Sequence, residues 1–339
     1  MARLTPEQPY TYASPARDTI CRLVEGDVAR LDRFAFRTLL LLPAGAALFA
    51  QTPVGFNLTG MWTVMYHEDM LERTDPGSPV GDYLGIPIND EDRLRADTWD
   101  ADLISVLEHQ CIPHASPYAM RAPSNLKITA IDDPTTSQIV AFIIDGTYAG
   151  PRTVWMNSRP HPSQFAPHTF AGFSTGVWEG DTLHIETTHI KAGYLRRNGI
   201  AFSDEATLTE FFDLHDKILT LTSITEDPVY LTEPLVRSES WLWNPYQVFQ
   251  PIASFGSCIP HPELPRPEGW IPHHLPGTNT QLLEFSEGYG IPYEATRGGA
   301  ETMYPEYQKK LKQMTIPHPK VFDTKFAREH PNQPGEKQQ

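Results

Sequence analysis

The stretch from residue 126 to residue 243 is a succession of short β-rich runs separated by turn signals, and this pattern constrains the fold more than any other. Asp132-Asp133-Pro134 and Glu226-Asp227-Pro228 start turns, because proline fixes φ and an Asp side chain bonds its own backbone. Glu179-Gly180-Asp181 indicates a tight hairpin. Many strands at short spacing favour an antiparallel barrel or sandwich over a parallel sheet. The expected strands are Gly60–Tyr66, Leu126–Ile131, Ile139–Asp145, Thr153–Met156, Phe170–Trp178, Thr182–His189, Thr207–Asp213, Ile218–Thr225 and Leu235–Trp243.

Two helices are expected outside this stretch. The first runs from Asn89 to Gln110, because Asn89 can cap it and three acidic residues follow in its first turn. The second is amphipathic and spans Thr302–Met314. Between residues 245 and 276 the chain is rich in proline and is expected to wrap the surface of the domain. The apolar stripe of the first helix is expected to consist of Leu94, Trp99, Leu103, Val106 and Leu107.

An export signal is expected ahead of the folded domain. Residues Thr38–Ala50 form an apolar run that ends in small residues and follows three arginines, as in a secretory signal. The run lies too far from the first residue for a normal signal, but Val28 can correspond to a GTG start codon. We therefore expect residues 1–27 to be an upstream extension, residues 28–50 to be a signal peptide, and the mature protein to be periplasmic or secreted. A buried core helix is the alternative.

Charge and cysteine content narrow the classes of partner. The chain has 27 Lys+Arg against 42 Asp+Glu, a net charge of -15, which disfavours nonspecific nucleic-acid binding. No apolar run reaches the roughly 20 residues that span a bilayer as a helix, so no transmembrane segment is expected in the mature chain. Beyond the expected signal, Cys111 and Cys258 predict either one disulfide, as in exported proteins, or two buried thiols.

Two central motifs resemble those of a known family. Residues 152–162 read RTVWMNSRPHP and resemble the RTIWMDGRPHP signature of an uncharacterised family of exported bacterial proteins. Residues 172–183, GFSTGVWEGDTL, are similar to that family's GFSTGxWEGDTL motif. The resemblance covers roughly residues 60–306 and implies a lipocalin-like barrel. Asn157 and Ser158 stand where the family has Asp-Gly, so a carboxylate is missing there. Shorter matches are Thr187–Lys191, Arg196–Gly199 and Asp227–Tyr230.

The combined prediction is a mainly β chain with one domain over residues 51–316. We expect an antiparallel, lipocalin-like β-barrel with a few peripheral helices and the Pro-rich wrapping segment, followed by a polar tail over residues 317–339. The sequence contains neither a GxGxxG nor a Walker-type loop, so a nucleotide-binding fold is poorly supported.

Strand alternation selects two candidate catalytic residues. In Thr182–His189, the face with Leu183 and Ile185 is the more apolar one, so it is expected to point into the barrel and to carry His189 with it. In the next strand the same rule buries Glu210 on an apolar face. A buried carboxylate needs a partner or its pKa rises. Glu210 is therefore either a general base or one half of a structural pair with an arginine.

A second pair of candidates lies in the RTVWMNSRPHP motif. His161 stands between two prolines, which stiffen its backbone, and Arg159 could place a guanidinium beside it at the barrel mouth. His168 follows in the same loop. With His189 and Glu210 these side chains could bind zinc, iron or copper, although their spacing matches no short metal motif. Histidines with structural hydrogen bonds are the alternative, and the sequence identifies neither a metal nor a cofactor.

Three further residues are candidates for substrate binding. Arg196 and Arg197 could hold an anionic group by forked hydrogen bonds, or could belong to a solvated loop. Trp155 could provide an aromatic platform, although such side chains are more often core residues.

Ser174 superficially matches the GxSxG nucleophile elbow of hydrolases, but β-rich sequence follows it where the elbow needs a helix.

Two functions from different classes follow from these candidates. One is an exported small-molecule enzyme, a hydrolase, lyase or isomerase, that uses His and Glu acid–base chemistry in the barrel mouth. The other is a noncatalytic, lipocalin-like binder of an apolar small molecule. Convergence of titratable groups inside the pocket would favour the enzyme, and an apolar pocket would favour the binder.

Overall fold

The architecture is described from a computed structural model, which covers residues 55–66, 78–100, 113–121, 124–146, 150–248 and 268–314. Several predictions concern residues outside these ranges. They include the upstream extension, the signal peptide, residues 101–110 of the first predicted helix, Cys111, Cys258, the polar tail and most of the Pro-rich segment.

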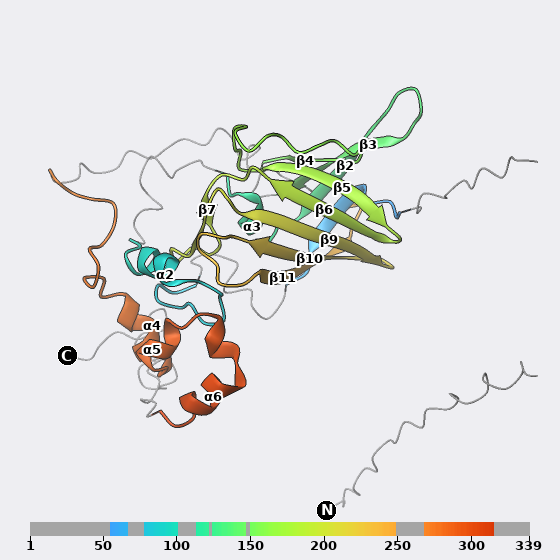
Figure 1. Ribbon diagram of the computed structural model, residues 1–339. Helices are drawn as coiled ribbons and strands as arrows, with labels where there is room; N and C mark the ends of the chain where they lie inside the picture. Colours follow the sequence, from blue (N-terminus) through green and yellow to red (C-terminus); the bar gives the residue numbers. More distant parts are fainter. Residues whose placement is uncertain are drawn as a thin grey trace, which may run out of the picture. The chain divides into compact units, whose positions relative to one another are not determined.

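Nine strands form a closed barrel in the order β1-β11-β10-β9-β6-β5-β4-β3-β2, and Figure 1 shows β5, β6, β9, β10 and β11 side by side in its wall. The predicted mainly β barrel is confirmed, and every predicted strand is present with its ends shifted by three residues or fewer. A separate two-stranded sheet pairs β7 (Gly193–Tyr194) with β8 (Ala201–Phe202). The barrel strands are β1 (Gly60–Val64), β2 (Leu126–Asp132), β3 (Ile139–Gly146), β4 (Arg152–Trp155), β5 (Phe173–Glu179), β6 (Thr182–Thr188), β9 (Thr207–His215), β10 (Ile218–Glu226) and β11 (Leu235–Trp243).

The expectation of a wholly antiparallel barrel is wrong at one pair. Strands β4 and β5 are parallel, with Val154 opposite Ser174 and Trp155 opposite Thr175. A parallel pair cannot be joined by a hairpin, so residues 156–172 must return the chain to the barrel end where β4 begins. We call these residues the β4–β5 connection. All other neighbours in the barrel are antiparallel.

The barrel interior follows the alternation of side chains along each strand. The inward face of β6 consists of Leu183, Ile185 and Thr187, each at most 1% exposed. The turn at Asp133 also forms as predicted, because its carboxylate accepts hydrogen bonds from the amides of Thr135 and Thr136. The largest members of this core are Trp62, Trp241, Phe142, Phe212, Leu58, Leu126, Ile128, Leu183 and Ile185.

The helices are shorter than predicted. Asn89 caps α2 (Asp90–Asp97) by accepting from the amide of Asp92 at 3.0 Å, but the helix ends at Asp97. Leu94, expected in its apolar stripe, is 52% exposed. The predicted Thr302–Met314 helix is divided into the 3-10 helix η3 (Ala300–Met303) and α6 (Pro305–Leu311). The remaining helices are α3 (Ser116–Ala119), α4 (Leu282–Tyr289) and α5 (Tyr293–Thr296). None of the helices in the described part of the chain has the length and apolarity needed to cross a membrane.

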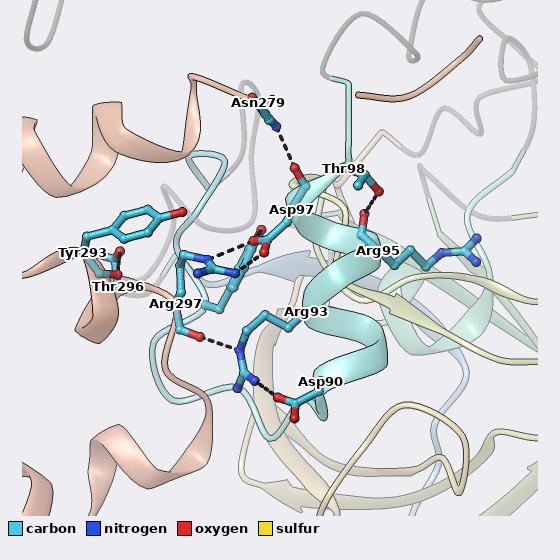
Figure 2. Close-up of polar contacts among 10 residues, drawn as sticks. Asp90, Arg93, Arg95, Asp97, Thr98, Asn279, Tyr293, Thr296 and Arg297 are labelled. Carbon is cyan, nitrogen blue, oxygen red and sulfur yellow. Dashed lines mark hydrogen bonds and ion pairs between the residues drawn. The ribbon is translucent and has the colours of Figure 1, made fainter. Parts of the chain in front are cut away.

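Polar contacts attach α2 to the segment that contains α5, as Figure 2 shows. Arg297 forms an ion pair with Asp97, and its Nε donates to the same carboxylate at 3.0 Å. Arg93 binds Asp90 and donates from Nε to the carbonyl of Arg297 at 2.9 Å. Asn279 donates to the carbonyl oxygen of Asp97 at 3.0 Å. Residues distant in sequence therefore hold the two helical regions together.

Candidate functional site

A cavity of about 160 Å³ lies between α3 and the barrel end at which β2 and β4 begin. Side chains of α3 and of the strand ends line it, and most of them are apolar. Its polar lining side chains are those of Arg152, His114 and Ser116. The apolar and backbone lining comes from Pro113, Ala119, Met120, Leu126, Ile144, Gly146, Gly150, Phe170 and Ala171.

Arg152 and Glu210 form a buried ion pair beside this cavity. Arg152, the first residue of β4, is 4% exposed, and Glu210 of β9 is fully buried. The terminal nitrogens Nη1 and Nη2 of Arg152 donate to the two carboxylate oxygens of Glu210 at 2.6 and 3.1 Å, which is a bidentate geometry. Glu210 therefore lies on the inward face, as predicted, and it has the arginine partner of the structural alternative. The arginine stabilises the charged form of this carboxylate, which makes Glu210 a weaker base.

His114 borders the cavity next to α3. Its ring contacts the ring of Tyr118 with a centroid distance of 4.4 Å. Burial lowers the pKa of His114 below its ordinary value, because the surrounding apolar groups disfavour the charged imidazolium. The ring is consequently neutral at pH 7, and it adds no charge to the cavity.

His189 does not enter the barrel, contrary to the prediction. Strand β6 ends at Thr188, and His189 has a φ of +56°. This left-handed conformation interrupts the alternation of side chains, so the ring stays on the outer face. There it lies against His168, with ring centroids 5.1 Å apart, and donates from Nε2 to the carbonyl of Ser163 at 2.8 Å.

His161 lies on the same outer face, over β5 and β6. Its Nδ1 is 2.7 Å from Oγ1 of Thr188, and its Nε2 is 2.8 Å from Oγ1 of Thr175. Thr188 also contacts Nδ1 of His189 at 2.8 Å. Burial lowers the pKa of His161, and the nearby His189 lowers it further, while Glu186 opposes this shift.

One hydrogen-bond direction in this group is fixed by its acceptor. Nε2 of His189 must donate, because a carbonyl oxygen only accepts. The hydroxyl of Thr188 lies between the two rings, within hydrogen-bond distance of Nδ1 of His189 and of Nδ1 of His161. Nε2 of His161 forms a hydrogen bond with the hydroxyl of Thr175 on its other side. We call this arrangement of Thr175, His161, Thr188 and His189 the histidine chain.

The other motif residues lie beside the histidine chain. The Arg159 guanidinium stacks on the ring of Trp155 at 3.5 Å from its centroid, and its Nε donates to Asn157. Trp155 projects outward, since it alternates with the inward Val154. His168 donates to the carbonyl of Ile190 at 3.0 Å. The structure therefore brings His161, His168, Arg159 and Trp155 near one face, outside the barrel.

Arg196 and Arg197 lie after β7, away from both groups. Arg196 is 7% exposed, and its guanidinium contacts the carbonyl oxygen of Asp82 at 3.3 Å and the carboxylate of Asp82 at 3.6 Å. It thereby holds the turn at residues 79–82. Burial lowers the pKa of Arg197. The two guanidinium groups do not reach the cavity lining.

The predicted set is thus divided between two faces of the sheet, with Glu210 inside and the histidines outside. Within the described ranges, no three His, Cys, Asp or Glu side chains are placed to hold a metal ion. Sequence reasoning missed Arg152 and His114. The alternation of β4 could have found Arg152, because it shares the inward face of Val154.

The comparisons with known proteins identify no relative. No protein-family model, no curated protein and no solved structure matches the chain.

Proposed function

We propose that the protein is a noncatalytic, lipocalin-like binder of a small, mostly apolar molecule, which occupies the cavity beneath α3. The observation that supports this most directly is the composition of the lining. Most lining side chains are apolar, the Arg152–Glu210 pair neutralises its own charge, and of the histidines described above only His114 borders the cavity, while His161, His168 and His189 lie outside. Such a lining provides burial for a ligand and few groups for chemistry.

The cavity volume limits the size of the ligand. Drug-sized ligands occupy pockets of about 300–1,000 Å³, whereas an engineered cavity of about 150 Å³ binds benzene. A cavity of about 160 Å³ therefore suits a molecule with roughly one ring.

Filling the cavity tests this proposal. Ala119 of α3 is 5% exposed and lines the cavity, so Ala119→Leu places a larger side chain in the space of the ligand. We expect toluene to raise the thermal midpoint of the full-length protein and to have no effect on Ala119→Leu. Ala192→Leu is the matched control, because Ala192 is exposed and is not one of the lining residues. Equal responses of all three proteins would show that toluene binds elsewhere.

A second candidate is acid–base catalysis on the outer face, which the histidine chain favours. The pKa of His161 is lowered by burial, and its ring is oriented by hydrogen bonds with Thr175 and Thr188, as in a base fixed by a third group. A screen of small esters and lactones with the wild type and His161→Gln tests it. His184→Gln is the control, because His184 also projects outward from β6. A hydrolysis rate common to all three proteins would eliminate the candidate.

A further inference from the structure

One of the residues that line the cavity, Arg152, has a buried hydrogen-bond donor without an acceptor among the described residues. Two nitrogens of the Arg152 guanidinium donate to Glu210, but the buried Nε has no partner in the part of the chain that the structure describes. Arg152 is also one of the residues that line the cavity. A buried donor that lost its water and gained no acceptor is costly, so nearly all such groups in folded proteins are paired. An acceptor on a bound molecule would remove this cost.

The charges around the cavity select the kind of acceptor. The Arg152 cation is compensated by Glu210 at hydrogen-bond distance. His114 is neutral at pH 7, since burial lowers its pKa. The remaining lining residues have no ionisable side chain. A charged ligand would therefore lose its hydration without meeting a counter-charge, which is strongly unfavourable.

We propose that the ligand is an uncharged molecule of about one six-membered ring that carries a hydrogen-bond acceptor, such as a ketone, ester or amide carbonyl, and that Nε–H of Arg152 donates to it. This rests on the proposed binding function and adds the chemical class of the ligand. The ion pair then has a second role: Glu210 fixes the guanidinium through its two ends and leaves Nε for the ligand.

Four probes of similar size separate the contributions of shape, acceptor and charge. They are toluene, cyclohexanone, cyclohexylammonium and cyclopentanecarboxylate, titrated by calorimetry into the full-length protein at pH 7. We expect cyclohexanone to bind about tenfold more tightly than toluene, because it satisfies the Nε donor at the strength of a typical net hydrogen bond. Both ions should bind at least about tenfold more weakly than toluene.

A double variant tests the role of the donor. Arg152→Met combined with Glu210→Gln removes both charges together and leaves no carboxylate without a partner. The double variant should bind cyclohexanone and toluene with about equal affinity, and it should still bind toluene. Arg95→Met is the control, because Arg95 lies on α2 outside the lining, and it should keep the preference.

The outcomes distinguish the ligand class from the binding function. Equal affinity of the wild type for toluene and cyclohexanone, or tightest binding of either ion, would overturn the ligand class and leave the binder intact. Failure of every probe to bind the wild type at about 10 mM would overturn the binding function itself. The test of the ligand class and the test of the binding function both use the wild type alone, so both remain valid even if the double variant does not fold.

Discussion

Replacement of Asp92 by Asn should stabilise the protein most at pH 8, with a smaller gain at pH 5. Asp92 lies in the first turn of α2 and is fully buried. Its Oδ1 accepts from the amide of Ala201 at 3.0 Å, while Oδ2 has no hydrogen-bond partner among the described residues. Burial raises the pKa of Asp92 from 3.8 to about 7, and the nearby Asp227 adds to the shift.

The sign of the effect follows from proton linkage. Between pH 4 and pH 7 the folded chain holds a proton that the unfolded chain has released, so the free energy of unfolding falls as the pH rises. The pKa of Asp92 is about 7 in the folded chain and 3.8 in the unfolded chain. Each pH unit between these values lowers the free energy of unfolding by about 1.4 kcal/mol, so the full loss is about 4 kcal/mol. Asn keeps the acceptor for Ala201 and has no charge to bury, so the loss disappears in the variant.

Urea denaturation at pH 5, 6, 7 and 8, followed by tryptophan fluorescence, measures this difference. The stability of Asp92→Asn relative to the wild type should rise from pH 5 to pH 7 and level off by pH 8, because the folded wild type keeps its proton up to a pKa of about 7 while the unfolded chain has already released it. Asp90→Asn is the control: Asp90 is in the same helical turn, but its side chain is 99% exposed. A stability difference that is the same at pH 5 and pH 8, or a variant less stable at pH 8, would refute the reasoning.

Three further predictions concern other parts of the chain. Arg152→Met alone should lower the free energy of unfolding by about 3–5 kcal/mol, because Glu210 is left buried and unpaired, and Glu210→Gln added to it should restore most of this in urea denaturation. Gly199→Ala should lower the thermal midpoint, since Gly199 has a φ of +96° and a new Cβ would lie 2.5 Å from Cβ of Trp99; an unchanged midpoint would contradict the contact. Intact mass of protein secreted by its native host should show a first residue near Gln51, and an N-terminus near residue 1 would eliminate the export signal.

The strands could be predicted because each is specified locally. Alternation and turn residues lie within a few positions of one another, so the inward face of β9, with Leu208, Glu210 and Phe212, follows from the sequence alone. The prediction of antiparallel pairing was wrong for β4 and β5, because their relative direction depends on the path of the long connection between them. The length of helix α2 was overestimated because its Asn cap and acidic first turn mark where a helix begins, whereas no local signal marks its end at Asp97.

The site was less predictable because its contacts join distant residues. Arg152 and Glu210 are 58 positions apart, and only the closed barrel brings them together. One backbone angle at His189 was enough to move its ring from the expected inner face to the outer one. Sequence alternation assumes regular strand geometry, so it fails where a strand ends.

The outward position of the histidines has a physical explanation that bears on function. His161 and His168 belong to the β4–β5 connection, and their ring nitrogens contact Thr188 and the carbonyl of Ile190 on the neighbouring strand segment. His189 donates back to Ser163 of the same connection. These contacts hold the returning chain against the barrel and so support the parallel pair. In this arrangement both ring nitrogens of His161 are occupied, so a substrate would have to replace the hydroxyl of Thr175 to reach a base. A ligand in the cavity needs no such rearrangement, and this difference favours the binder over the enzyme.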